Sequence, residues 1–175
     1  VVTKNDFKFF ADCTVTIDPT AEELAEIAIQ TCELAKYFDV TPRVAMLSYS
    51  TFGSAAGPSP AKMRAAAELF RQRRPDLEVE GEIQAEFAAS TETRQAEFPF
   101  STLTEDANVF IFPNLDAANI AYQMIHRLGG AEVIGPVLLG MHQPVNVLQI
   151  GTSVPSIVNL AALTALRAQG EEFVF

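Results

Sequence analysis

The stretch Asn108-Val-Phe-Ile-Phe-Pro-Asn-Leu-Asp-Ala-Ala-Asn-Ile-Ala-Tyr122 decides the fold, because within it a buried strand runs directly into a helix. Residues 108–112 form a short apolar run of the kind that a parallel sheet buries on both faces, and Pro113 ends it because proline cannot donate to a strand ladder. Asn114 and Asp116 stand where the N-cap and first turn of a helix favour them. Ligands of open α/β sheets bind outside the carboxyl ends of the strands, where helix N–H groups attract anions. This junction is therefore the first candidate for a binding site.

The same strand-to-loop pattern occurs twice more. A strand expected at 43–48 opens into a loop rich in hydroxyl groups, and a strand expected at 145–149 opens into residues 150–153, just before Pro155. Proline is favoured in the first turn of a helix. Three strand ends can share one edge of a sheet only if the strands are parallel neighbours. The sequence therefore predicts an α/β fold with a mostly parallel sheet.

Helices and further strands are expected around these three junctions. Thr20 followed by Glu23 is a capping box, and it begins a helix whose apolar stripe continues to about Phe38. Gly129 and Gly130 end another helix as a C-cap. The remaining expected elements are a strand or strand pair at 7–17, a helix at 61–73, a strand at 77–81, a short helix at 83–89, a mostly irregular segment at 91–106, a helix at 117–128, a strand at 131–140 and a last helix at about 155–168.

Composition excludes several classes of protein. The 175 residues are 49% hydrophobic but contain no apolar run of about eighteen residues, so no membrane span is expected. A net charge of -10 without a basic stripe argues against a protein that binds nucleic acid. Cys13 and Cys32 fall in an expected strand and helix and read as small buried hydrophobes. No signal peptide precedes Val1, so a cytoplasmic protein is expected.

Each candidate polar residue has a functional and a structural interpretation. Ser48, Ser50, Thr51 and the nearby Ser54 suit a ligand's phosphate or pantetheine and suit a self-satisfied loop equally well. For Asn114 and Asn119, a helix cap and a buried bracing amide are slightly favoured. Gly151, Thr152 and Ser153 form an anion-binding turn or merely cap the last helix.

The other charged residues favour structural roles. Alternation along a strand places Glu78, Glu80 and Glu82 on one face, which indicates a solvated surface rather than a metal site because no histidine is nearby. His126 lies late in a helix, where a cation suits the helix dipole. His142 lies in a turn and has no evident serine or cysteine partner, so no metal site and no nucleophile are expected.

At this point a family resemblance covers nearly the whole chain. The segments that carry it resemble the phosphotransacetylase family, and they are Phe10-Ala-Asp12, residues 18–29 from Asp18-Pro-Thr-Ala to Ile29, Pro42-Arg-Val-Ala-Met-Leu-Ser48, Gly81-Glu-Ile-Gln84, Ala107-Asn-Val-Phe-Ile-Phe-Pro113 and Ile134-Gly-Pro136. The resemblance covers only the later half of that family's domain, so residues 1–175 are expected to be a single phosphotransacetylase-like domain fragment. It implies a three-layer α/β/α architecture akin to the isocitrate dehydrogenase fold, with acetyl-CoA in the cleft between two parts.

The chain departs from the family pattern at the positions that carry its chemistry. Phosphotransacetylases have a Ser-Arg-Gly-Cys-Ser motif followed by an Asp, and here the Ser, Arg and Asp positions are taken by Gln149, Ile150 and Ser156. That removes a cation for the phosphate and a carboxylate for a thiol proton, groups worth several kcal/mol in such chemistry. We therefore expect no catalytic residue and negligible acetyl transfer.

The segment 115–122 and Gln149 look more like the C-terminal domain of large bacterial malic enzymes. That resemblance implies a non-catalytic regulatory and oligomerisation domain that senses acetyl-CoA. The parent would oxidise malate to pyruvate with NADP and a divalent metal in its own catalytic domain. Its expected partners are that catalytic domain, the missing half of the domain and a second copy, and the all-round apolar last helix packs on one of them. The expected cleft residues are Ser48, Ser50, Thr51, Asn114, Asn119, Gly151, Thr152 and Ser153.

Two alternatives to this function stay open at the level of sequence. One is a dimerisation module without ligand binding, which the uncharged Ile150 and Ser156 favour. The other is an active phosphate acetyltransferase, which converts acetyl-CoA and phosphate to acetyl phosphate and CoA.

Overall fold

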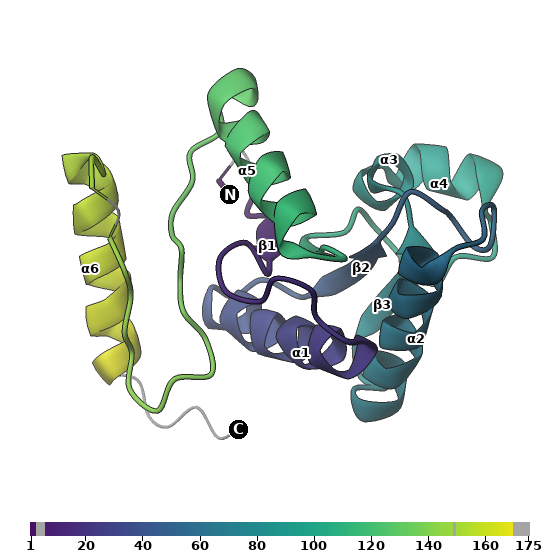
Figure 1. Ribbon diagram of the computed structural model, residues 1–175, viewed down its shortest axis with the longest axis horizontal. Coiled ribbons are helices and arrows are strands. Elements are labelled where there is room, and N and C mark those ends of the chain that lie inside the picture. Colours follow the sequence, from purple (N-terminus) through teal and green to yellow (C-terminus); the bar gives the residue numbers. More distant parts are fainter. Residues whose placement is uncertain (3–5, 149, 170–175) are drawn as a thin grey trace.

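The chain forms one parallel sheet with helices on both faces (Figure 1). The computed structural model describes residues 1–2, 6–148 and 150–169. Its elements follow in the order β1 (Phe9–Ala11), α1 (Ala21–Tyr37), β2 (Arg43–Leu47), α2 (Pro58–Arg73), β3 (Glu78–Ile83), α3 (Ala85–Ala89), α4 (Thr91–Glu97), β4 (Val109–Ile111), α5 (Leu115–Gly129) and α6 (Val154–Gln169). The strand order is β1-β4-β2-β3, and every neighbouring pair is parallel.

Strand β4 is buried on both faces, as its sequence predicts. Val109 and Ile111 join the core that α1 and α2 cover. Phe110 and Phe112 join a second core, which Ala88 of α3 and Ala118 of α5 complete. The predicted three-layer α/β/α architecture with a parallel sheet is therefore confirmed.

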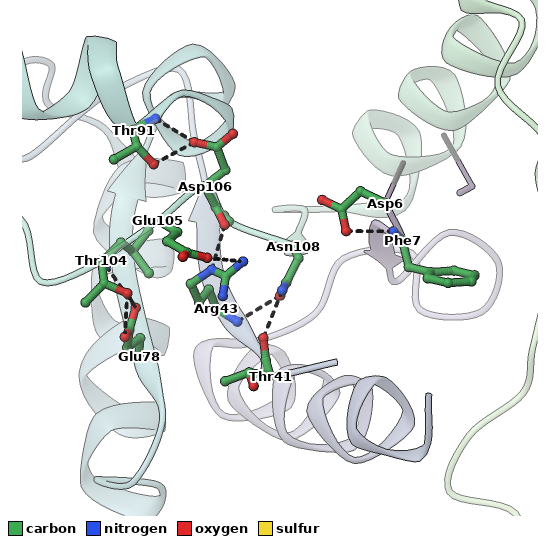
Figure 2. Close-up of polar contacts among 12 residues, drawn as sticks. Asp6, Phe7, Thr41, Arg43, Glu78, Thr91, Thr104, Glu105, Asp106 and Asn108 are labelled. Carbon is green, nitrogen blue, oxygen red and sulfur yellow. Dashed lines mark hydrogen bonds and ion pairs between the residues drawn. The ribbon is translucent and has the colours of Figure 1, made fainter. Parts of the chain in front are cut away.

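Asn108 fastens the start of β4 to the start of β2 (Figure 2). Its side-chain oxygen accepts a hydrogen bond from the backbone N–H of Arg43 at 2.8 Å, and its amide donates to the carbonyl oxygen of Thr41 at 2.9 Å. The Arg43 side chain reaches the carbonyl oxygen of Asp106 and the Glu105 carboxylate. These contacts lie at the amino ends of the strands, so they set the register of the sheet and leave the carboxyl ends free.

Two expected strands are wrong. Residues 145–148 form no strand, and Gln149 lies outside the described residues. Val145, Val147 and Leu148 are all exposed, and none of them pairs with a strand that the structure describes. In the segment 131–140, only Glu132 makes a bridge, and Pro136 withholds a ladder donor.

The first strand is shorter than the predicted 7–17. Its carboxyl end is fixed by Asp12, whose side chain accepts the backbone N–H groups of Thr14, Val15 and Thr16 at 2.7 to 3.0 Å. These bonds turn the chain away from the sheet, as an aspartate side chain often does. The irregular segment predicted at 91–106 contains a full helix, α4, at its start.

Helix α6 stands apart from the sheet, at the end of an irregular segment that follows α5 (Figure 1). Within the described residues, no helix is long and apolar enough to cross a bilayer.

Candidate functional site

The carboxyl ends of the four strands meet along one edge because all pairs are parallel. The loop 48–57 follows β2, residues 12–16 follow β1, Pro113 and Asn114 follow β4, and Gln84 follows β3. This edge is where open α/β sheets bind ligands. It brings the first two predicted junctions side by side on β2 and β4.

The hydroxyl loop after β2 is fastened to the end of β3. Ser50 and Thr51 are both buried. The Thr51 hydroxyl donates to Gln84 Oε1 and accepts from the Gln84 backbone N–H, both at 3.0 Å. The Ser48 hydroxyl accepts from the Ser50 backbone N–H at 3.3 Å and is half-buried. The two buried hydroxyls therefore hold the loop in place, and Ser48 is the more accessible of the three.

Glu82 is the centre of this loop, and its side chain has no exposed surface. Its Oε1 accepts from the Ser50 hydroxyl at 2.9 Å and from the Gly53 backbone N–H at 2.8 Å. Both carboxylate oxygens bind Arg64, through Nε at 2.8 Å and Nη2 at 2.9 Å. Burial alone would raise the pKa of Glu82, but the hydrogen bonds from Arg64, Gly53 and Ser50 outweigh it and lower the pKa. Glu82 is therefore ionised at neutral pH and has no proton to donate.

Asn114 and Asn119 occupy structural positions on α5. The Asn114 side chain is the N-cap and accepts from the Ala117 backbone N–H at 2.9 Å. The Asn119 amide donates to the carbonyl oxygen of Cys13 at 3.3 Å, and its oxygen accepts from Gln123 at 2.6 Å. The Asn114 contact is the expected helix cap. Asn119 is half-buried and braces the loop after β1, whereas the expectation was a buried amide that braces a strand.

A cavity of about 710 Å³ lies beside β1 and extends along the whole strand, from residues 7–8 to residues 12–16. Its walls come from the loop after β1, from α1 and from the segment between α5 and α6. Most of the lining is apolar, and Phe9, Ile27 and Leu34 contribute to it. Asp12 and Thr16 add polar groups. The cavity size falls in the range of about 300 to 1,000 Å³ that is common for small-molecule sites.

Gly151, Thr152 and Ser153 line this cavity, in front of α6. Gly151 has a φ of 91°, a left-handed conformation that suits glycine. The Ser153 hydroxyl accepts from the Ser156 backbone N–H at 3.3 Å and lies 2.8 Å from the Ser156 hydroxyl. Ser153 thus caps the helix, while the turn also faces the cavity. Gly151, Thr152 and Ser153 therefore lie at the cavity beside β1, whereas the predicted Ser48, Ser50 and Thr51 line neither this cavity nor the smaller one beside Arg64.

The three positions where the chain departs from the phosphotransacetylase pattern lie around this turn. Ile150 is fully exposed, and Ser156 lines the cavity. Gln149 lies outside the described residues. Neither Ile150 nor Ser156 carries a charge, so the cation and carboxylate of the family motif have no counterpart at these two positions.

The acidic residues of β3 do not form the predicted solvated face. Glu80 is buried and accepts hydrogen bonds from the backbone N–H and hydroxyl of Thr102. Glu78 binds Thr104 in the same way (Figure 2). The prediction fails because the loop 101–104 covers this edge strand and supplies donors to it. Among the described residues, no three His, Cys, Asp or Glu side chains are grouped to hold a metal ion.

The family model described as phosphate acetyl/butaryl transferase matches residues 1–165. The chain belongs to this family. The phosphate acetyltransferase of Bacillus subtilis (strain 168) is 43% identical over 91% of this chain and 49% of its own length. Among solved structures, a phosphotransacetylase from Streptococcus pyogenes is 47% identical with a TM-score of 0.86. The match covers 91% of this chain and 48% of that one. EutD phosphotransacetylase from Staphylococcus aureus has a TM-score of 0.87 at 38% identity, covering 95% of this chain and 52% of that one.

These comparisons overturn the regulatory interpretation. The chain spans about half the length of the Bacillus relative, at 49%. Relatives from Nitratidesulfovibrio vulgaris and Clostridium acetobutylicum are also phosphate acetyltransferases, 45% and 44% identical over more than nine-tenths of this chain. The expected non-catalytic domain of a malic enzyme, with its NADP chemistry, is therefore wrong. The segment 115–122, on which that expectation rested, forms the first two turns of α5.

The sequence did not single out Glu82 or Arg64 as site residues. Glu82 belongs to the Gly81-Glu-Ile-Gln84 segment that resembles the family, and that resemblance was the available signal. Strand alternation suggested an exposed side chain instead. Arg64 lies on the helix expected at 61–73, and no local pattern indicates its pairing because Glu82 lies 18 positions away.

Proposed function

We propose that this chain is part of a phosphate acyltransferase that moves an acetyl group between CoA and phosphate. The identity of 43% to the Bacillus phosphate acetyltransferase over 91% of this chain carries the proposal. The shared strand edge and the solved relatives support it. Because the chain spans about half of that relative, the active protein is taken to include further sequence.

The chemistry that such a site performs is acyl transfer. An oxygen of phosphate attacks the thioester carbonyl, the carbon–sulfur bond breaks, and the CoA thiolate takes up a proton. Backbone N–H groups aimed at the developing oxyanion are the usual means of lowering such a barrier. In this proposal the acyl group enters the 710 Å³ cavity, and the turn at 151–153 supplies N–H groups at its mouth.

The proposal is tested by measuring acyl transfer and by restoring a charge at Ile150. The full-length protein is incubated with acetyl-CoA and phosphate, and released CoA is followed through its thiol. Turnover well above a protein-free control supports the proposal, and its absence with both acetyl-CoA and butyryl-CoA sinks it. Ile150→Arg is expected to raise the rate about tenfold or more, since a guanidinium stabilises transferred phosphate charge. Glu92→Gln on the exposed face of α4 is the matched control and should leave the rate unchanged.

A further inference from the structure

Arg64 of α2 carries a guanidinium that Glu82 of β3 holds at the carboxyl edge of the sheet. It projects from the second turn of α2, and its Nε and Nη2 form a two-pronged pair with Glu82. A planar guanidinium held in this way has few rotamers to lose when it binds something else. The pair therefore fixes the direction of the side chain.

The outer part of Arg64 is open to solvent. Its side chain is 56% exposed, while Glu82 is fully buried. The Nη1 group makes no hydrogen bond with any residue that the structure describes, so two N–H donors point outward. Glu82 also accepts from Ser50 and Gly53, so its charge is shared among several donors. The pair uses Nε and Nη2 of the guanidinium and leaves its Nη1 donors available to a ligand.

A cavity of about 310 Å³ lies beside this open side. Arg64 contributes its only charged side chain, and the other walls are small or backbone-rich residues. They are Gly53, Ala55, Ala56, Gly57, Pro60 and Ala61. Small residues let a ligand come close to the backbone, and no carboxylate lines the cavity to repel an anion. The start of α2 adds little by itself, because Pro58 and Pro60 have no N–H to donate.

The charges on the rest of the protein favour Arg64 as the place where an anion binds. A net charge of -10 repels anions from most of the surface. The neighbouring cation of α2, Lys62, is paired at 2.6 Å with Asp18. An anion approaching this edge therefore meets Arg64 as the favourable contact.

We propose that the cavity beside Arg64 binds a phosphate group of the substrates, with Glu82 as the residue that positions the guanidinium. The ligand class is a phosphate monoester or inorganic phosphate, which a guanidinium recognises through parallel N–H donors. Two sources carry this chemistry under the proposed function: the 3′-phosphate of CoA, which lies far from the thioester along the CoA molecule, and free inorganic phosphate bound apart from the acyl group. The site rests on the proposed function only for the choice between these sources.

The test is titration calorimetry of the full-length protein with CoA, dephospho-CoA and inorganic phosphate. Arg64→Gln is compared with Arg73→Gln, an exposed arginine near the end of the same helix that lies 3.7 Å from Glu26. Arg64→Gln is expected to weaken at least one phosphate-bearing ligand tenfold or more, and Arg73→Gln to leave all three unchanged. Circular dichroism melting of both variants confirms that they are folded.

The three ligands separate the sources. If Arg64 holds the 3′-phosphate, wild-type protein binds dephospho-CoA about as weakly as Arg64→Gln binds CoA. If Arg64 holds inorganic phosphate instead, the variant loses affinity for inorganic phosphate and keeps its affinity for both forms of CoA. Unchanged binding of all three ligands, or equal losses in the Arg73→Gln control, overturns the site. Arg64-dependent phosphate binding in a protein without acetyl transfer would leave the site standing and sink only the proposed function.

Discussion

Glu82 illustrates how one side chain can join three elements at the residue scale. It lies on β3, accepts from the loop after β2 and binds a guanidinium on α2. Hydrogen bonds to a charged group contribute about 1.5 to 3 kcal/mol, more than those between neutral groups. A carboxylate with four such contacts and no exposed surface should therefore be among the more costly side chains to alter.

Glu82→Gln should lower the free energy of unfolding by about 2 kcal/mol at pH 7, because an amide presents an N–H₂ group to donors. The pKa of Glu82 is lowered from its ordinary value of 4.5. Its contribution is therefore full above about pH 4.5 and is lost as the pH falls through the lower folded value. Urea unfolding of both proteins should show a gap that shrinks below pH 4.5. A gap independent of pH would contradict this, and Glu92→Gln, an exposed residue on α4, serves as the control.

Arg94 is a second residue whose substitution has a defined consequence. The guanidinium is fully buried and donates to the carbonyl oxygens of Phe87, Leu103 and Glu105 at 2.8 to 3.1 Å. Arg94→Met would leave these carbonyls unpaired, so the free energy of unfolding should fall by about 3 kcal/mol or more. The free energy of unfolding of Arg94→Lys should lie between those of the wild type and Arg94→Met, since one ammonium group cannot reach all three carbonyl oxygens. Urea unfolding at pH 7 measures both, and a loss below about 1 kcal/mol for Arg94→Met would refute the assignment.

At the scale of elements, α5 tests whether a residue at the strand edge caps a helix or binds a ligand. Asn114→Ala should cost about 1 kcal/mol, because it removes the N-cap bond to Ala117. Asn114→Ser keeps an N-cap oxygen and should be nearly neutral. The KM for acetyl-CoA should be unchanged in Asn114→Ser. An increase in KM with unchanged thermal stability would instead assign the amide to substrate binding.

The elements that the sequence predicted well are those with local signals. The capping box of Thr20 and Glu23 begins α1 as expected, and Gly130 ends α5 with a φ of 65°. The apolar run of β4 identified the central buried strand because burial on both faces leaves no alternation. The segment 145–148 failed because its β-branched residues need a neighbouring strand, and sequence alone does not show whether an edge is available.

The candidate site was predicted only in part, for the same reason. The carboxyl ends of β2 and β4 do lie together, because parallel neighbours follow from the strand-to-helix pattern. The direction in which each side chain points could not be predicted from that pattern. Ser50 and Thr51 turn inward to Glu82 and Gln84, which lie more than thirty positions away in the chain. Pairing over such separations depends on how β3 is placed, and no periodicity reports it.

At the scale of the whole molecule, burial is distributed unevenly. The sheet and α1 share a dense core, whereas α5 has an exposed apolar stripe of Ile120, Met124 and Leu128. Their four-residue spacing places these three side chains on one face of the helix. Helix α6 likewise exposes Ile157, Val158 and Leu166. In an isolated chain these faces stabilise nothing, so the two parts of the molecule should differ in local stability.

Hydrogen exchange can measure this difference directly. Helix α1 buries seven residues, whereas α6 buries Leu160, Leu163 and Arg167. The polar contacts that fasten α6 include a hydrogen bond from Asn146 to Thr164 at 2.7 Å and one from Arg167 to Leu138 at 3.0 Å. Because opening a segment with few buried contacts costs less free energy, amides of α6 should exchange at least about a hundredfold faster than those of α1.

The measurement is exchange mass spectrometry on peptides from α1 and α6 in the 175-residue chain and in the full-length protein. In the shorter chain α6 should exchange early and α1 late. If the additional sequence of the full-length protein covers the exposed apolar residues of α6, exchange there should slow while that of α1 changes little, since α1 already lies against the sheet. Equal protection of α1 and α6 in the 175-residue chain would show that the contacts of α6 suffice, and that its exposed face needs no cover.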